Sequence, residues 1–397
     1  MITVNEARTR ILAGLHLAGT ESVMLANAAG RVLAAPIQAR LAQPPADVSA
    51  MDGYAVRAAD AQPGASLRLI GQAPAGRPFA GGVQPGETVR IFTGSYIPAG
   101  TDSVLIQENA TATNTGIIVN EACTAGRHIR RTGQDFALGD TLLTGSRRLT
   151  SRDIGLAAAG NHPWLTVYRR PRIAILSTGD EISLPGEPIG PGGIVNSNAV
   201  MLAAFATTCG ADPIILPIAS DDPASIAAGA TAARGADLLI TTGGASVGAH
   251  DLVQAGLAQH GFVLDFWKIA MRPGKPLIFG HVGGMPVLGL PGNPVSAFVC
   301  AVLFLAPAIA AMTGLPDTAP VLEQARLAGS LPENDSREDY LRARLQTAED
   351  GLIVATLTGQ DSGMLTPLAK ANALLRRPPF QEALAPGTLV EIIRLTL

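Results

Sequence analysis

The stretch Asp237-Leu-Leu-Ile-Thr-Thr-Gly-Gly-Ala-Ser-Val-Gly-Ala-His-Asp251 carries more structural information than any other in this chain. An apolar run stops in a loop of glycines and hydroxyl side chains, and an acid follows where a helix is expected to begin. A buried strand, a glycine-rich loop and a helix in that order build anion sites at the carboxyl edge of parallel sheets. Glycines let backbone amides approach a phosphate, and the helix N-terminus adds positive potential.

Two further stretches follow the same order. Arg172-Ile-Ala-Ile-Leu-Ser-Thr-Gly-Asp-Glu181 is an apolar strand followed by hydroxyls and carboxylates, and Pro286-Val-Leu-Gly-Leu-Pro-Gly-Asn-Pro-Val-Ser296 is a strand followed by a turn. Three such strand ends predict one crevice. The spacing of Gly243, Gly244 and Gly248 excludes a dinucleotide fingerprint, and Gly274-Lys275-Pro276 does not form a P-loop.

Composition narrows the class of protein. A chain of 397 residues, 47% of them hydrophobic, predicts about two to four domains with sizeable cores. The net charge of -3 and the 4% aromatic content give no reason to expect a nucleic-acid partner. Cys123, Cys209 and Cys300 lie far apart and the N-terminus has no apolar signal segment, so we expect a reduced, cytoplasmic protein.

One uncharged segment, Val295 to Met312, is barely long enough to span a bilayer. An Asn-Pro turn precedes it, Pro307 interrupts it, and no cluster of basic residues flanks it. We therefore expect a buried helix and no membrane partner.

The pattern of elements changes along the chain. Short β-like runs separated by turns, beginning after Gln43-Pro-Pro45, predict a small β domain. From Arg172 to about Leu315 strands alternate with helices, which predicts a parallel sheet with right-handed crossovers. The tail after Pro320 returns to short strands.

Several polar residues have both a functional and a structural explanation. Asp52 precedes a glycine and could simply form a turn, while Asp251, Asp180 and Glu181 could simply cap helices. Lys275 is one of only three lysines among 29 basic residues, which suggests a requirement for an ammonium group, although chance explains it equally well.

Taken together, these stretches resemble the molybdopterin molybdenumtransferase family, which includes the E domain of gephyrin. The resemblance spans nearly the whole chain in the family's order. Its segments are Ser49 to Val56, Thr93 to Glu108, Gly133 to Asp135, Leu176 to Glu181, Asn196 to Asn198, Thr242 to Asp251, Pro273 to Pro276 and Gly289 to Ser296, with weaker matches over Arg337 to Arg342 and Gly359 to Asn372.

The resemblance implies a multidomain α/β plus β architecture. An elongated first domain would comprise residues 1–42 and 127–170, with a small β domain inserted at 43–126. A parallel α/β domain that binds molybdopterin would occupy 171–318, and a β-barrel-like domain 319–397. The family forms homodimers, with each site built between the α/β domain of one subunit and other domains of its partner.

The resemblance also implies an activity. The enzyme would insert molybdenum from molybdate into adenylylated molybdopterin and release AMP, with Mg²⁺ assisting, and the adenylyltransferase of the same pathway is a possible partner. Two other classes stay open. One is a molybdopterin adenylyltransferase or pyrophosphate hydrolase on the same α/β platform, and the other is a non-catalytic scaffold that binds the pterin.

Family positions map onto this sequence residue by residue. Catalytic roles fall on Asp52, Thr93, Asp135, Glu181, Asp251 and Lys275, and the metal ligands would be Glu181 and Asp251. Residues expected to hold the pterin nucleotide or molybdate are Ser177, Thr178, Gly179, Asp180, Gly243, Gly244, Ser246, Gly248, Arg272, Pro291, Gly292, Asn293, Pro294, Arg337 and Ser362. Arg272 departs from the family pattern, because many members carry lysine at this position. A planar guanidinium group thus replaces a compact ammonium group.

Overall fold

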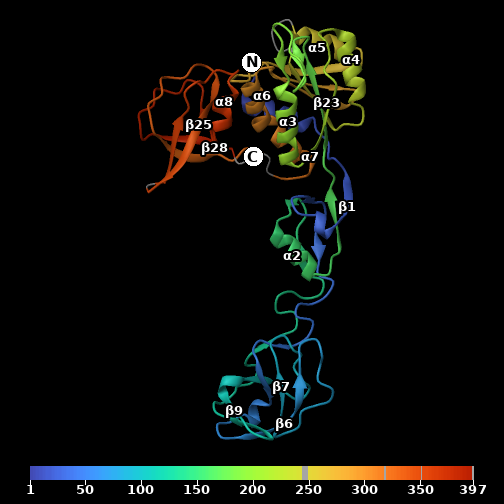
Figure 1. Ribbon diagram of the computed structural model, residues 1–397, viewed down its shortest axis with the longest axis vertical. Helices are drawn as coiled ribbons and strands as arrows, with labels where there is room; N and C mark the ends of the chain where they lie inside the picture. Colours follow the sequence, from blue (N-terminus) through green and yellow to red (C-terminus); the bar gives the residue numbers. More distant parts are fainter. Residues whose placement is uncertain (244–248, 317–318, 350, 396–397) are drawn as a thin grey trace.

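The protein is elongated, with two bulky domains at one end and a β domain at the other (Figure 1). The structure is a computed structural model that describes residues 1–243, 249–316, 319–349 and 351–395, and only the backbone at 249–251. Both chain termini lie at the bulky end (Figure 1). The chain therefore runs out to the β domain and returns.

The N-terminal helix α1 (Val4–Ala13) begins at Thr3, whose hydroxyl accepts a hydrogen bond from the Glu6 amide at 3.1 Å. This helix packs its buried face into the core of the α/β domain. The chain then forms a small four-stranded sheet from two distant segments. Its strands, in spatial order, are β1 (Thr20–Met24), β14 (Trp164–Tyr168), β2 (Val32–Leu33) and β13 (Arg147–Arg148), with helix α2 (Ser151–Ala159) packed beside them.

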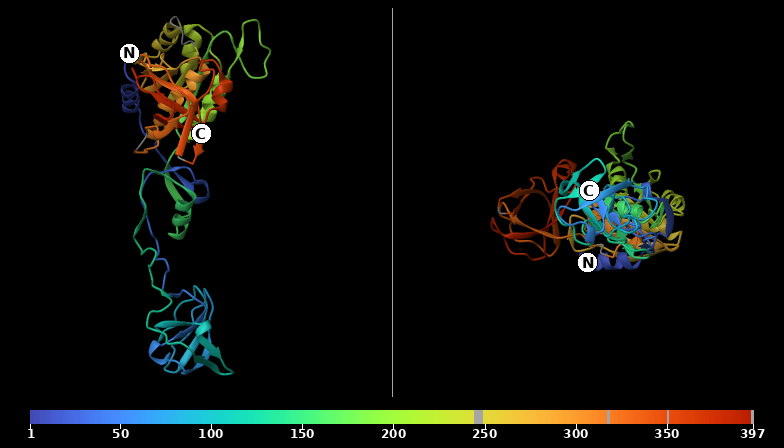
Figure 2. Two further views of the ribbon diagram at one scale, coloured as in Figure 1. Left: turned by 90° about the vertical axis from the view of Figure 1, so that its left-hand side faces the viewer. Right: turned by 90° about the horizontal axis from the view of Figure 1, so that it is seen from below.

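Two short antiparallel ladders lead from this sheet toward the β domain. They pair β3 (Ile37–Gln38) with β12 (Thr141–Leu143), and β4 (Val48–Ser49) with β11 (Ile129–Arg130). Asp47 reinforces the second ladder, because its carboxylate binds Arg131 at 2.6 Å and accepts a hydrogen bond from the Thr132 amide at 2.8 Å. Two chain segments, one outgoing and one returning, thus connect the two ends of the molecule (Figures 1 and 2).

The β domain is a six-stranded sheet with an apolar core on each face. The strands, in spatial order, are β8 (Ser103–Ile106), β5 (Gly53–Val56), β7 (Glu87–Ile91), β6 (Ser66–Ala73), β10 (Gly116–Val119) and β9 (Ala110–Ala112), with short 3₁₀ turns at Ala58–Asp60 and Gln107–Asn109. One core gathers Val56, Leu105 and Ile117, and the other gathers Ala55, Val89 and Ile91. Neighbouring residues of β5 thus face opposite cores.

The α/β domain is built on a six-stranded sheet. Its strands, in spatial order, are β18 (Asp212–Ile215), β15 (Arg172–Thr178), β19 (Leu238–Gly243), β23 (Met285–Leu290), β22 (Ile278–Val282) and β20 (Phe262–Trp267). The first four are parallel, and β22 and β20 extend the sheet antiparallel. On β19, Leu238 and Ile240 face one apolar layer and Leu239 faces the other, as expected for a parallel sheet covered on both sides.

Helices cover both faces of this sheet. Helix α3 (Ser197–Cys209) and a long helix formed by α6 (Pro294–Cys300), a π-helical stretch (Ala301–Leu305) and α7 (Ala306–Met312) lie on the face that also receives α1. Helices α4 (Pro223–Ala232) and α5 (Ala249–Ala258) lie on the other. In the described part of the chain, the helix Pro294–Met312 has the length and hydropathy of a membrane span, but 78% of its apolar window is buried inside the protein. This burial is what a core helix shows.

The C-terminal domain is a closed five-stranded barrel. Its strands run in the order β25 (Glu338–Ala348), β26 (Gly351–Thr356), β24 (Glu323–Leu327), β28 (Leu389–Arg394) and β27 (Ala373–Arg377), and β27 pairs back with β25. Strand β21 (Met271–Arg272) leaves the α/β domain and pairs with β25, and helix α8 (Leu365–Lys370) packs on α6. The barrel and the α/β domain are therefore joined side by side.

The predicted fold class is confirmed: a multidomain α/β plus β protein with an inserted β sheet and a C-terminal barrel. Helix Val295 to Met312 is buried as expected. Sequence reasoning missed strands β20 and β22, because the sheet was expected to be parallel throughout. It also missed the small sheet around β1 and β14, whose partners are more than a hundred residues apart.

Gly53 provides a test of the β domain. A Cβ atom at this position would lie 2.1 Å from the Leu105 carbonyl oxygen on the paired strand β8. We expect Gly53→Ala to destabilise the β domain by about 2 kcal/mol, because the strands must separate. Calorimetric unfolding should show the β domain melting earlier while the transition of the α/β domain is unchanged.

Gly155→Ala is the matched control, since this helical glycine has no atom within 4 Å of the added Cβ. The control should be neutral or slightly stabilising. If Gly53→Ala unfolds with wild-type transitions, the close pairing of β5 and β8 is contradicted.

Candidate functional site

A cavity of about 560 Å³ lies at the carboxyl ends of β15, β19 and β23. These strands are neighbours, with Thr178 paired to Gly243 and Thr242 paired to Leu290, so their three loops open onto one place. The lining residues are Ser177, Glu181, Ile182, Ile194, Val195, Asn196, Ser197, Asn198, Thr242, Gly243, Pro276, Pro291, Gly292, Asn293, Pro294, Ser296, Gly363 and Leu365. The crevice predicted from the three strand ends is present.

Glycines allow the loops to meet. Gly243 has a φ of +105°, and a Cβ atom there would lie 2.1 Å from the Thr178 carbonyl oxygen. The ideal Cβ position of Gly292 lies 3.4 Å from the Gly243 Cα atom. The backbones after β19 and β23 are therefore in contact, as required of a cradle made of main-chain groups.

Part of the predicted loop cannot be placed. Gly244, Ser246 and Gly248 lie outside the described residues. Asp251 lies in the first turn of α5, where the structure describes the backbone alone. Their predicted roles stay predictions.

Buried hydroxyl and amide side chains fix the other walls of the cavity. Asn196 caps α3 by accepting a hydrogen bond from the Ala199 amide at 3.2 Å, and its Nδ2 donates to Ser177 Oγ at 2.9 Å. Asn198 Nδ2 donates to Thr242 Oγ1 at 3.0 Å and to the Gly292 carbonyl at 2.7 Å. Sequence reasoning gave these asparagines no role, although the place of Asn196 just before a helix was a visible capping signal.

Three carboxylates gather beside the cavity. Glu181 lines it, and Asp180 accepts a hydrogen bond from the Asp221 amide at 3.1 Å. Burial raises the pKa of Asp221, and the neighbouring charges of Asp180 and Glu181 raise it further. Asp221 was missed from the sequence because the Asp221-Asp222-Pro223 run resembles a helix cap, and Asp222 does cap α4.

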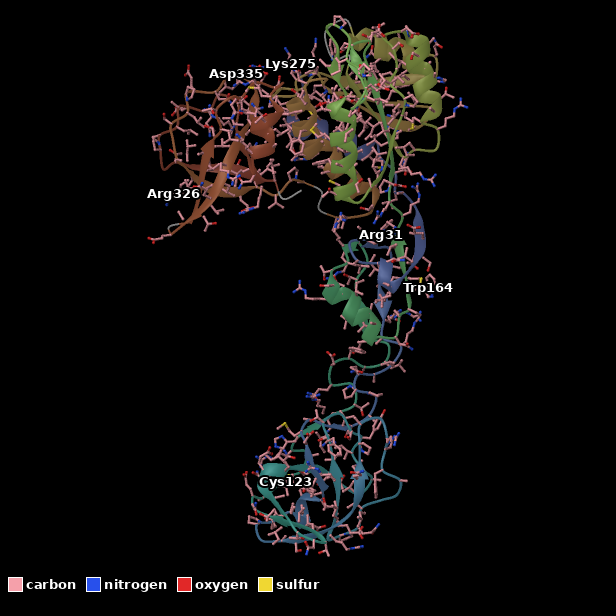
Figure 3. The ribbon with its side chains drawn as sticks, in the orientation of Figure 1. Arg31, Cys123, Trp164, Lys275, Arg326 and Asp335 are labelled. Atoms are coloured by element: carbon pink, nitrogen blue, oxygen red, sulfur yellow. The ribbon has the colours of Figure 1, made fainter. Side chains whose placement is uncertain are left out.

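Basic residues lie on the barrel side. The exposed Lys275 directly precedes Pro276, which lines the cavity. Arg272 binds Asp339 and also contacts Asp335 at 3.3 Å, while Arg337 binds Asp335 at 2.8 Å. Figure 3 places Lys275 and Asp335 along the edge where the α/β domain adjoins the barrel.

These ion pairs affect titration. The hydrogen bond from Arg337 is the main cause that lowers the pKa of Asp335 to about 2, and the hydrogen bond to Asp339 is the main cause that raises the pKa of Arg272. Both predicted arginines are therefore paired with carboxylates. Among the described residues predicted to hold the oxyanion, Lys275 is the one cation without a carboxylate partner.

The barrel also contributes directly to the cavity. Ser362 Oγ accepts a hydrogen bond from Asn293 Nδ2 at 2.9 Å, and the Ser362 carbonyl accepts one from the Val295 amide at 3.0 Å. Gly363 and Leu365 then reach the lining. Ser362, which the resemblance assigns to the substrate site, thus contacts the Pro291-Gly292-Asn293-Pro294 turn, a contact that the sequence did not predict.

The remaining predicted residues lie far away, on the β domain and its connection. Asp52 accepts hydrogen bonds from the backbone amide and the hydroxyl of Thr93, both at 2.8 Å. These two bonds, the backbone one first, lower the pKa of Asp52. Asp135 and Gly94 line a separate hollow of about 570 Å³. The structure brings Asp52 to Thr93 but does not bring either to the cavity of the same chain (Figure 1).

Comparison with protein families covers nearly the whole chain. Residues 2–160 match the MoeA N-terminal region (domain I and II), residues 174–311 match a probable molybdopterin binding domain, and residues 324–395 match the MoeA C-terminal region (domain IV). The three matches occur in the order in which the small sheet with the β domain, the α/β domain and the barrel follow one another.

Individual relatives agree with these matches. The chain is 37% identical to the molybdopterin molybdenumtransferase of Nostoc sp., over 95% of this chain and 89% of that protein. It is also 37% identical to molybdopterin molybdenumtransferase 2 of Mycobacterium tuberculosis, over 94% and 95%. Two solved structures of the molybdopterin biosynthesis MoeA protein from Pyrococcus horikoshii align with TM-scores of 0.88 and 0.84 at 28% and 29% identity, covering 100% and 99% of this chain and 100% of each of theirs.

The carboxylate group gives a pH prediction. Because the folded-state pKa of Asp221 is raised above its unfolded value, its stabilising contribution is present below the unfolded value of 3.8 and is lost as the pH rises through the raised value. We expect Asp221→Asn to unfold at a higher temperature than wild type at neutral pH, with the difference vanishing below about pH 4. Circular dichroism melts over a pH series measure this, and a less stable variant at neutral pH would contradict it.

Proposed function

Because this chain belongs to the molybdopterin molybdenumtransferase (MoeA) family, enzymes that insert molybdenum in cofactor biosynthesis, we propose that its substrates are adenylylated molybdopterin and molybdate. The products are AMP and molybdenum cofactor. The observation that carries this proposal is the single cavity in which main-chain loops of the α/β domain meet a serine loop of the barrel, with Lys275 at its border.

The cavity fits an elongated anionic substrate. Loops with glycine at close-approach positions cradle phosphate groups, and Gly243 and Gly292 take such positions here. We assign to the cradle Ser177, Thr178, Gly179, Asp180, Gly243, Pro291, Gly292, Asn293 and Pro294, together with Gly244, Ser246 and Gly248, which lie outside the described residues. Ile182, Ile194 and Leu365 supply apolar walls for a flat ring. They belong in part to the β16 (Ile182–Ser183) and β17 (Ile194–Val195) arm, which extends away from the sheet (Figure 2).

Molybdate is a small dianion that needs convergent donors and positive charge. Among the predicted oxyanion-binding residues that the structure describes, Lys275 is the cation without a carboxylate partner, and the Ser362 hydroxyl accepts a hydrogen bond from Asn293. Arg272 and Arg337 both form ion pairs with Asp335. An oxyanion bound between the two arginines would therefore compete with the Asp335 carboxylate for both guanidinium groups. The arginine at position 272 thus anchors the barrel as well as adding charge.

The acids fit Mg²⁺. Carboxylate oxygens are the ligands that this ion prefers. Glu181 and Asp180 lie near Asp221, whose pKa is raised by burial first and by these two neighbouring charges second. We assign Glu181 and Asp251 as ligands. The bound ion would offset negative charge on the phosphoanhydride that is cleaved when AMP leaves.

We propose that the working unit is a homodimer. Asp52, Thr93 and Asp135 are catalytic in this proposal, yet Asp52 and Thr93 lie on the β domain and Asp135 on the connection that leads to it, away from the cavity at the bulky end (Figure 1). A second copy can supply them from its β domain and the adjoining connection. In a monomer, the Asp52 carboxylate, whose pKa is lowered, would lie far from the cavity in which the substrate is proposed to bind.

The proposal includes the domain boundaries. The elongated first domain comprises residues 1–42 and 127–170, the β domain 43–126, the α/β domain 171–318 and the barrel 319–397. The protein acts in the cytoplasm, and the adenylyltransferase that makes its substrate is a fitting partner. It needs neither nucleic acid nor membrane.

The central test is an incubation with adenylylated molybdopterin and Mg²⁺, with and without molybdate. We expect AMP release that depends on molybdate, together with molybdenum cofactor detected by reconstitution of a molybdenum-free enzyme. Release without molybdate would indicate the hydrolase, and binding without turnover would indicate the scaffold.

A mixing experiment tests the shared site. Asp52→Asn and Lys275→Ala should each be inactive as homodimers, because each variant damages both sites. Co-expressed with two different tags, they form heterodimers in which one site holds neither substitution. The co-expressed mixture should recover about a quarter of wild-type activity, as expected for random pairing in a two-fold dimer.

Homodimers purified separately and combined only in the assay serve as the control. An inactive heterodimer of normal stability would mean that each site is built within one chain.

A further inference from the structure

Asn198 has a hydrogen-bonding pattern that the fold does not complete. The side chain is 9% exposed and lines the cavity near the start of α3. Its Nδ2 donates to Thr242 Oγ1 and to the Gly292 carbonyl, but its Oδ1 is buried and has no hydrogen-bond partner among the described residues. A buried acceptor left without a donor is costly, so its retention requires an explanation.

The orientation of the amide is set by its neighbours. The Gly292 carbonyl can only accept a hydrogen bond, and it lies 2.7 Å from Nδ2. A reversed amide would place Oδ1 against that carbonyl, oxygen to oxygen, and would lose both donated bonds. Oδ1 is therefore the atom on the unsatisfied side.

An acceptor at this place selects the part of the substrate that can lie beside it. A phosphate oxygen or molybdate would be repelled by Oδ1, whereas a hydroxyl or an amino group would donate to it. We propose that Asn198 is a specificity-determining residue whose Oδ1 accepts a hydrogen bond from an N–H or O–H group of the pterin nucleotide. The inference rests on the proposed function, because it takes its ligand from that substrate.

The same amide also ties the cavity together. Through Nδ2 it connects the start of α3 to the last residues of β19 and to the turn after β23. Substrate recognition and loop positioning would thus be coupled. A substrate group that donates to Oδ1 would hold the Asn198 amide in place, and the Nδ2 of the same amide fixes the loops at the ends of β19 and β23. A purely structural clamp would need Nδ2 alone.

The test compares Asn198→Ala with wild type. We expect the KM for adenylylated molybdopterin to rise at least about tenfold, with kcat changed much less, because a donor of the substrate loses its acceptor. Binding of inorganic pyrophosphate, which offers the site only phosphate oxygens, should change little. Thr313→Val is the control, since it removes a buried hydroxyl whose hydrogen bonds within the described part of the chain go to carbonyls of α7. Thr313 follows the last turn of the long helix whose first turn lines the cavity.

Asn198→Asp separates recognition from clamping. It keeps an acceptor on the unsatisfied side but sets an oxygen against the Gly292 carbonyl, so its melting temperature should fall at least as far as that of Asn198→Ala. At an acidic pH that protonates the introduced carboxyl group, it should nevertheless retain more substrate affinity than the alanine variant, because one of its oxygens remains an uncharged acceptor on the unsatisfied side.

Two results would overturn the inference. One is an unchanged KM in a folded Asn198→Ala protein, and the other is a loss of affinity that follows the loss of melting temperature equally in both variants. If the wild-type protein does not turn over the substrate, the proposed function fails. The role of Asn198 can then still be tested by measuring the affinities of the wild type and Asn198→Ala for AMP and for molybdopterin. Weaker binding of either ligand to Asn198→Ala supports it, and unchanged binding of both rejects it.

Discussion

The structure depends on the close approach of three backbones at one edge of a parallel sheet. Gly243 accepts a positive φ and leaves no room for a Cβ beside the Thr178 carbonyl, and Gly292 lies against Gly243. The parallel pairing of β15, β19 and β23 brings these positions together, and glycine keeps the space open for main-chain donors. A side chain at Gly243 would separate the strand ends, and the cavity between their loops would lose its shape.

Charge around this edge is divided between two domains. Asp180, Glu181 and Asp221 belong to the α/β domain, whereas Asp335 and Arg337 belong to the barrel. The strand pairing of β21 with β25 and the ion pairs of Arg272 hold the two domains in register. The backbone ladder sets the register, and the ion pairs of Arg272, one of them to the buried carboxylate of Asp339, set the charge next to Lys275.

Sequence reasoning worked where the signal was local. The apolar run before Gly243 and the turn at Pro291 to Pro294 each predicted a strand end, and the parallel class of the sheet then predicted that they meet. It failed where the partner is distant in sequence. The sequence around Asp221 contains no pattern that predicts its closeness to Asp180 and Glu181. Likewise, no local pattern predicts the hydrogen bond from Asn198 to the Gly292 carbonyl, 94 positions away. Strands β20 and β22 were missed because their antiparallel pairing has no signature within the βα alternation.

The separation of Asp52 from the cavity is a consequence of the same architecture. The chain crosses twice between the bulky end and the β domain, and the crossing is held by two short ladders, by Asp47, and by apolar residues such as Ile37 and Leu143 that belong to the core of the small sheet. Asp52 cannot approach the cavity of its own chain without breaking those ladders. In the proposed homodimer it would instead be presented to the second subunit. Thr93 donates two hydrogen bonds to the Asp52 carboxylate and these bonds lower its pKa, so the orientation and charge of this side chain are fixed within the β domain and do not depend on the cavity.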